Sequence, residues 1–286
     1  MKIGITSYSL SKIIKSGEMD ILGAIRWVAE NGGEHIELSP SGYTLTDNPE
    51  LVKAVVQEAA KNGIAISSYT IGANFIKPTE AEYRAEIKRV KSEVDIGHAL
   101  GVKRMRHDAG ARPREEATVA NFERDLPRLI EACREIADYA AQYGITTSVE
   151  NHGFHVQASE RVHRLVLGVD RPNFRTTLDV GNFLCVDEDP LIAVKNNVAL
   201  ASHVHMKDFY VRKYNPGEGF FLTRNGRYLR SAIVGQGDVP IPEIIRLIRQ
   251  SGYDGFVSIE FEGLEDCRLA SRIGMENVRR LWDAAV

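Results

Sequence analysis

The sequence predicts an α/β protein: a single (β/α)8 TIM barrel whose one domain spans residues 1–286. Short runs rich in β-branched residues recur at regular intervals, and segments with helical periodicity lie between them. Strands that alternate with helices pair in parallel through helical crossovers, and eight such units close into a barrel. An open, doubly wound sheet is the alternative, but the chain contains no GxGxxG phosphate turn after its first strand.

Eight runs are predicted to be strands because β-branched and aromatic residues are bounded by turn residues. The first, "KIGITSYSL", starts close to Met1, and the last, "FVSIEFEG", precedes the final helix. The runs are residues 2–10, 33–40, 64–70, 102–108, 145–151, 174–182, 201–209 and 256–263.

The helices are predicted from apolar side chains that recur at helical spacing. Segment 79–100 opens with Thr79 and Glu82, a capping-box pair. Segment 127–143 is expected to begin at Pro127, because a first helical turn tolerates proline. The other predicted helices are residues 20–31, 48–62, 158–168, 188–198, 241–251 and 265–284.

One connection is unusually long. Residues 210–239 lie between the seventh strand and its helix, and loops of this length are usually functional or interaction elements. Within it, "FFLTRNGRYL" predicts a hairpin that turns at Asn225-Gly226. The segment alone leaves open whether it is a lid over the site or a contact between subunits.

The composition is that of an ordinary soluble globular protein, with 43% hydrophobic and 26% charged residues. A formal net charge of −3 argues against a duplex nucleic-acid partner, which calls for a basic excess. The three cysteines form no CxxC pair, so we expect reduced thiols in a cytoplasmic protein. Neither a signal peptide nor a membrane span is expected from the sequence.

Candidate ligands for a metal ion end four successive predicted strands: Glu150, Asp179, His205 and Glu260. The active site of such a barrel lies at the carboxyl ends of its strands, so these side chains are expected to meet. Each has a polar residue two positions earlier on the same face, which predicts a deeper polar layer of Ser148, Thr177, His203 and Ser258.

Three carboxylates in one place would repel one another and have raised pKa values unless a cation joined them. Oxygen-rich ligands with one imidazole suit Mn2+, Mg2+, Co2+ or Zn2+. We therefore expect one divalent metal ion, with Mn2+ favoured, and room in its shell for two substrate oxygens.

Six further polar residues near the same strand ends are candidate substrate contacts: Glu37, His107, His152, Asn182, Lys207 and Glu262. Lys207 follows His203 and His205 in the inward alternation of the seventh strand and could neutralise a substrate anion. The alternative for each of the six is a structural role.

At these residues the chain resembles the sugar phosphate isomerase/epimerase group of the xylose-isomerase-like TIM barrel superfamily. The resemblance covers nearly the whole chain. Its most specific pieces are "SVENHG", "TTLDVGN", "HVHMKDF", "GQGDVPIPEI" and "GYDGFVSIEFEG".

This resemblance implies a divalent-metal-dependent isomerase or epimerase of a sugar or related polyhydroxylated carbonyl compound. Glu150, Asp179, His205 and Glu260 match the family's metal ligands, and the two glutamates match its catalytic acid and base, which transfer a proton through a metal-stabilised enediolate. A homodimer or tetramer is the family-level expectation.

The chain departs from the ketose 3-epimerases that it resembles. These have a histidine, an arginine and a glutamate at the positions of Asn182, Val211 and Val156. The departures argue against 3-epimerisation of a free ketose and leave the metal site intact.

Three alternatives stay open. The first is a metal-dependent dehydratase, or lyase, of a keto-inositol or dehydroshikimate-like substrate, which shares the proton abstraction beside a carbonyl. The second is an abasic-site endonuclease, which would need more metal ligands and a basic face. The third is a non-catalytic barrel, against which the intact carboxylate cluster argues because unused buried charges are costly.

Overall fold

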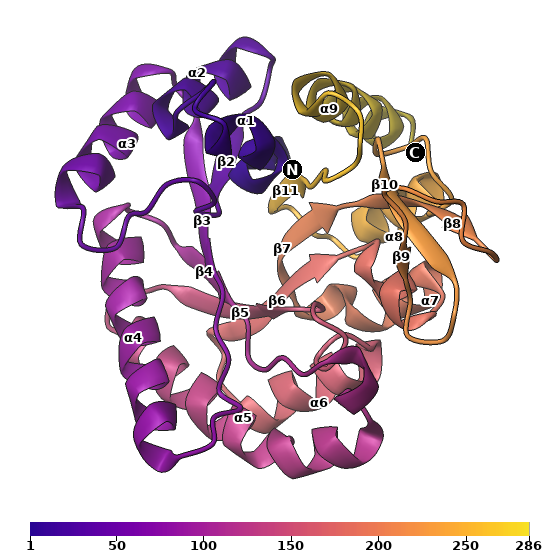
Figure 1. The fold of residues 1–286 in the computed structure, drawn as a ribbon. Helices are drawn as coiled ribbons and strands as arrows, with labels where there is room; N and C mark the ends of the chain where they lie inside the picture. The colour runs from indigo at the N-terminus through magenta and orange to yellow at the C-terminus, as the bar shows by residue number, and fades with distance from the viewer. Residues whose placement is uncertain (286) are drawn as a thin grey trace.

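The computed structural model describes residues 1–285 and contains the predicted barrel (Figure 1). Eight parallel strands close in the order β1-β11-β7-β6-β5-β4-β3-β2. Their bounds are β1 (Lys2–Thr6), β2 (His35–Leu38), β3 (Ala65–Ile71), β4 (Arg104–His107), β5 (Thr146–Glu150), β6 (Phe174–Asp179), β7 (Ala201–Met206) and β11 (Phe256–Ile259).

The helices surround the barrel (Figure 1). They are α1 (Ser11–Lys15), α2 (Ile21–Glu30), α3 (Pro49–Lys61), α4 (Glu80–Ala99), α5 (Val119–Ala141), α6 (Ser159–Val169), α7 (Pro190–Asn197), α8 (Ile241–Gln250) and α9 (Cys267–Ala284). Each packs by an apolar stripe, as α8 shows with its buried Ile241, Ile244, Ile245 and Ile248.

The start of α5 corrects one prediction. The helix begins at Val119 rather than at Pro127, and the proline lies inside it. Thr118 caps the new start by accepting a hydrogen bond from the Asn121 backbone N–H. Buried Phe122 extends the apolar stripe into the added turns, and this burial offsets the hydrogen bond that proline cannot donate.

The long connection after β7 forms a three-stranded antiparallel sheet, in the order β8 (Asp208–Arg212), β10 (Tyr228–Ala232), β9 (Phe221–Leu222). The predicted hairpin is confirmed: β9 and β10 pair around a turn in which Gly226 adopts a φ of 106°. Such a positive φ is the conformation that glycine adopts without strain.

A single carboxylate joins this sheet to the segment that follows it. Asp208 begins β8 and is fully buried. Its two oxygens accept hydrogen bonds of 2.8–3.1 Å from the backbone N–H groups of Phe209, Gly235, Gly237 and Val239. The aspartate of "HVHMKDF" therefore organises the connection rather than contacting substrate.

Within residues 1–285, none of the helices combines the length and apolarity that a membrane crossing requires.

Candidate active site

Four side chains converge at the carboxyl ends of β5, β6, β7 and β11. One potential ligand atom each from Glu150, Asp179, His205 and Glu260 lies within 4.8 Å of the other three. The Nδ1 atom of His205 lies 3.0 Å from Glu260 Oε2 and 3.7 Å from Glu150 Oε2. Strand register brings them together, because Asp179 pairs directly with His205 across β6 and β7.

The donor set fits a divalent cation. Asp179 Oδ1 accepts hydrogen bonds of 2.8 Å from the backbone N–H groups of Gly181 and Asn182. Its other oxygen, Oδ2, is buried and has no hydrogen-bond partner within residues 1–285. A buried carboxylate oxygen without a donor is costly, and a cation among the four side chains would satisfy it.

The electrostatics of Asp179 and His205 also favour a cation at this site. Burial, together with Glu150 and Glu260, raises the pKa of Asp179 to about 7, although Lys207 opposes the shift. Burial lowers the pKa of His205, but the surrounding carboxylates outweigh it and raise that pKa well above its ordinary value. The cluster therefore attracts positive charge strongly.

The predicted polar layer lies beneath these four residues. The hydroxyls of Ser148 and Thr177 are 2.8 Å apart, and His203 Nε2 lies 2.8 Å from Ser258 Oγ. All four side chains are buried. The two-residue alternation of the strands therefore predicted the depth of this layer correctly.

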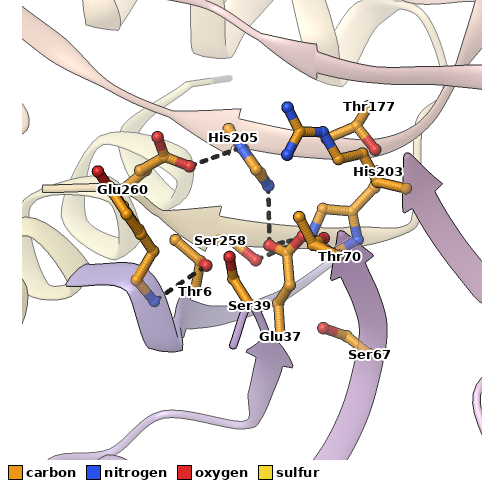
Figure 2. Close-up of polar contacts among 12 residues, drawn as sticks. Thr6, Glu37, Ser39, Ser67, Thr70, Thr177, His203, His205, Ser258 and Glu260 are labelled. Atoms are coloured by element: carbon orange, nitrogen blue, oxygen red, sulfur yellow. Dashed lines mark hydrogen bonds and ion pairs between the residues drawn. The ribbon is translucent and has the colours of Figure 1, made fainter. Parts of the chain in front are cut away.

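Glu37 lies deeper than a substrate contact would. Its carboxylate is fully buried, and its Oε2 lies 2.8 Å from His205 Nε2 and 3.4 Å from His203 Nε2 (Figure 2). Its Oε1 accepts a hydrogen bond of 2.5 Å from the Thr70 hydroxyl. These contacts place Glu37 behind the histidine, and it is not among the walls of the cavity described below.

His107 is also placed away from the cavity. The ring is fully buried, hydrogen-bonds the Asp108 carbonyl at 2.8 Å and packs edge-on against Phe75. Its neighbour Arg106 points into the barrel instead, where its Nε lies 3.1 Å from Glu150 Oε2. The alternation in "VKRMRHD" carried this signal, because it puts Arg106 and His107 on opposite faces of the strand.

Lys207 and Glu262 lie at the mouth of the site. Lys207 donates to Glu260 Oε1 at 2.8 Å and to Glu262 Oε1 at 2.7 Å. Burial opposes its charge, but these two carboxylates outweigh it and raise the pKa of Lys207 well above its ordinary value. The ammonium group is therefore a fixed positive charge beside Glu260.

Asn182 and His152 differ in exposure. Asn182 is buried and donates from Nδ2 to Glu150 Oε1 at 2.9 Å, so it holds a potential metal ligand. His152 is half exposed, and its Nδ1 lies 3.4 Å from Asp108 Oδ1. Of these two side chains, only that of His152 is accessible to a substrate.

A cavity of 150 Å³ opens above the cluster. Sequence reasoning identified Glu150, His152, Lys207, Glu260 and Glu262 among its walls. The sequence analysis did not identify the other walls, which are Thr6, Tyr8, Ser39, Thr70 and Arg106. Only Arg106 had a signal, the strand alternation described above, because hydroxyl side chains are common elsewhere in the chain.

Solved structures share this fold. The D-psicose 3-epimerase of Clostridium cellulolyticum superposes with a TM-score of 0.76 at 17% identity, covering 99% of each chain. The probable 3-DHS dehydratase of Bacillus anthracis gives a TM-score of 0.76 at 18% identity, covering 98% of this chain and 99% of that one.

Curated relatives match most of the chain at low identity. An inosose dehydratase of Lacticaseibacillus casei is 24% identical over 268 residues, covering 79% of this chain and 88% of the relative. An inosose dehydratase of Clostridium botulinum is 25% identical, with coverages of 79% and 89%.

A model of the family described as "Xylose isomerase-like TIM barrel" matches residues 25–281, which include all four clustered side chains. The match spans most of the chain and agrees with the closed eight-stranded barrel. The chain therefore belongs to the xylose isomerase-like TIM barrel family.

Proposed function

We propose that this chain is a divalent-metal-dependent enzyme that modifies a small sugar or related polyhydroxylated carbonyl compound. Its first step is removal of a proton from the carbon beside the carbonyl. One observation carries the proposal: Glu150 and Glu260 both line the 150 Å³ cavity and both approach His205 in the cluster that fits a cation.

The two glutamates have different surroundings, which suits different roles. Glu260 lies between His205 and Lys207; burial raises its pKa, but in the metal-free protein Lys207 and His205 outweigh burial and hold that pKa below its ordinary value. It is therefore an ionised base at neutral pH. Glu150 accepts a hydrogen bond from Asn182 and pairs with Arg106, and these contacts fix its position beside the same cavity.

A cation held by Glu150, Asp179, His205 and Glu260 would stabilise negative charge that develops on the substrate oxygen. Arg106 and Lys207 add fixed positive charge to the same cavity wall. These groups oppose the charge that proton removal creates and orient the substrate's oxygens.

Loss of water from a keto-polyol is the outcome that we favour. The curated relatives that match most of the chain are inosose dehydratases, and a keto-inositol fits the class of small polyhydroxylated carbonyl compounds. After Glu260 takes the proton, the electron pair forms a carbon–carbon double bond and the bond to the hydroxyl beta to the carbonyl breaks. The departing oxygen takes that proton back from Glu260 and leaves as water, while Lys207, which lines the same cavity and donates to Glu260, opposes the negative charge on that oxygen.

Isomerisation or epimerisation is the second candidate. The observation in its favour is the second glutamate, because Glu150 could return a proton where Glu260 removes one. The two outcomes share their first step and differ in whether the substrate carries a leaving group beta to its carbonyl.

The test uses Mn2+-loaded protein and 2-keto-myo-inositol in heavy water, followed by mass spectrometry. Loss of water mass supports the dehydratase, while deuterium in an intact carbon skeleton supports isomerisation or epimerisation. Glu260→Gln should lose turnover by at least about a hundredfold, since general base catalysis contributes this much. Glu243→Gln, on exposed α8 surface, is the matched control. Full activity in Glu260→Gln would refute the assigned role.

A further inference from the structure

A second cavity, of 160 Å³, adjoins the catalytic cavity on the side of the three-stranded sheet. The two cavities share three lining residues, His152, Lys207 and Glu262. They are therefore neighbouring compartments at one mouth of the barrel, and a molecule in one can extend into the other.

Three aromatic side chains line the second cavity: Phe154, Phe209 and Phe221, which we call the aromatic annex. Phe209 is only 1% exposed, so Phe154 and Phe221 supply most of the accessible ring surface. Polar side chains complete the walls: His152, Gln157, Asn182, Lys207 and Glu262. The rings of Phe209 and Phe221 meet edge to face, with centroids 5.9 Å apart. Lys207 joins the compartments, because its Nζ contacts Glu260 and lies 5.7 Å from the centroid of Phe209. The annex thus begins where the polar catalytic cavity ends.

Phe221 and Phe154 lie on segments outside the barrel strands. Phe221 lies on β9, in the hairpin of the long connection, and is 39% exposed rather than packed into the core. Phe154 lies in the loop after β5 with a φ of 61°, a strained value for a bulky residue. Gln157 holds that conformation by accepting the Phe154 N–H at 2.6 Å. Such strained positions cluster at sites of ligand contact.

We propose that the aromatic annex binds a flat, apolar group attached to the sugar-like substrate. This rests on the proposed function and narrows its substrate class, from a free keto-sugar or keto-polyol to a conjugate such as an aryl glycoside. Against the rings of Phe154 and Phe221 a hydroxyl-rich group would lose hydrogen bonds to water, whereas an aromatic substituent is stabilised there. The long connection after β7 then has a role: it supplies one wall of the substrate site.

The experiment compares the binding of methyl β-D-glucoside and phenyl β-D-glucoside to Mn2+-loaded protein by calorimetry. Neither probe has a carbonyl, so neither is turned over. Burial of the phenyl group should make the second probe bind about tenfold more tightly than the first. Phe221→Ala should reduce that preference to about threefold or less, because an aromatic contact is lost.

Tyr214→Ala is the matched control. Tyr214 is an exposed aromatic residue of the same connection and is absent from the walls of both described cavities, so its removal should leave the preference unchanged. Equal affinities for the two probes, including no measurable binding of either, would overturn the proposal. So would a phenyl preference that persists in a folded Phe221→Ala protein, its folding checked by thermal unfolding.

Failure of the annex and failure of the proposed function are separable. Turnover of 2-keto-myo-inositol without a phenyl preference removes the annex alone. A phenyl preference in a protein whose Glu260→Gln variant keeps full activity on its substrate removes the proton-transfer assignment alone.

Discussion

His205 is bound on both sides by carboxylates: its Nε2 lies 2.8 Å from Glu37 Oε2, and its Nδ1 lies 3.0 Å from Glu260 Oε2 (Figure 2). Glu37 is fully buried on β2, across the barrel from β7. A carboxylate behind a histidine ligand fixes the ring's tautomer and orientation and increases its basicity. Glu37 is therefore a positioning residue that acts through His205.

Replacing Glu37 by glutamine should weaken Mn2+ binding by about 10- to 100-fold, the usual cost of losing such a partner. Calorimetric titration of the chelator-treated protein measures this directly. Glu50→Gln, exposed in the first turn of α3, should bind Mn2+ like the unmodified protein. Unchanged affinity in Glu37→Gln would show that His205 needs no support from behind.

The connection after β7 should depend on Asp208. Asp208→Ala leaves four backbone N–H groups without their acceptor, so we expect a loss of about 3 kcal/mol or more in the free energy of unfolding. Residue 237 is restricted to glycine by the same contact, because a Cβ there would lie 2.2 Å from Asp208 Oδ1. Urea unfolding gives the loss. Hydrogen exchange should locate it in residues 209–239, and a uniform increase across the barrel would contradict this assignment.

Asp125 on α5 ties together two loops near the site. It accepts hydrogen bonds from Arg112 Nε at 2.6 Å and Nη2 at 2.8 Å, and its Oδ2 lies 2.9 Å from His155 Nε2. His155 lies three residues after the cavity-lining His152. Asp125→Asn should therefore cost about 2 kcal/mol of stability at neutral pH, the value of hydrogen bonds to a charged group.

The pH dependence of that cost follows from the direction of the pKa shift. Burial raises the pKa of Asp125, but Arg112 and His155 outweigh it and lower the pKa below the ordinary value. A carboxyl group whose pKa is lowered in the folded state stabilises the protein at pH values above its unfolded-state pKa. This stabilisation is lost as the pH falls through the folded-state pKa. The gap between Asp125→Asn and the unmodified protein, measured by urea unfolding, should shrink below about pH 4. A stability difference between the two proteins that increased in acid would refute the ion pair of Asp125 with Arg112.

The barrel and its cluster could be predicted from the sequence because both depend on local rules. Alternation within a strand fixed which side chains face inward, and four strand ends placed Glu150, Asp179, His205 and Glu260 together. The contacts that Glu37 makes behind His205 depend on strand register instead, which a single sequence does not show. The pairing of β2 with β3 shifts between Ile36 and Glu37.

Two further outcomes depended on tertiary packing. Arg106 is a buried charged residue, and its ion pairs with Asp108 and Glu150 offset the cost of burying its charge. The start of α5 was missed because burial of Phe122 outweighs the local preference of Pro127 for a first turn. Contacts between distant segments decided both, and periodicity does not report such contacts.

Replacing Asp179 tests the metal site, because the same substitution should stabilise the metal-free protein and destabilise the Mn2+-bound protein relative to the unmodified one. In the metal-free protein, burial and the neighbouring glutamates raise its pKa from the ordinary value of 3.8 to about 7. A carboxyl group with a raised folded-state pKa destabilises the fold increasingly as the pH rises between those two values, and fully above the higher one. Asp179→Asn should therefore stabilise the metal-free protein at pH 8, and this gain should vanish near pH 4.

Saturating Mn2+ should reverse the order of the two proteins. Binding at about 100 times the dissociation constant adds about 2.7 kcal/mol to the unmodified fold, which corresponds to an increase of about 5 °C in the unfolding temperature. Asp179→Asn loses an anionic ligand and should gain little. Asp138→Asn, which breaks an exposed pair with Arg171, should show the full increase. Thermal unfolding with and without Mn2+ at pH 8 measures all three proteins, and equal increases in all of them would place the cation elsewhere.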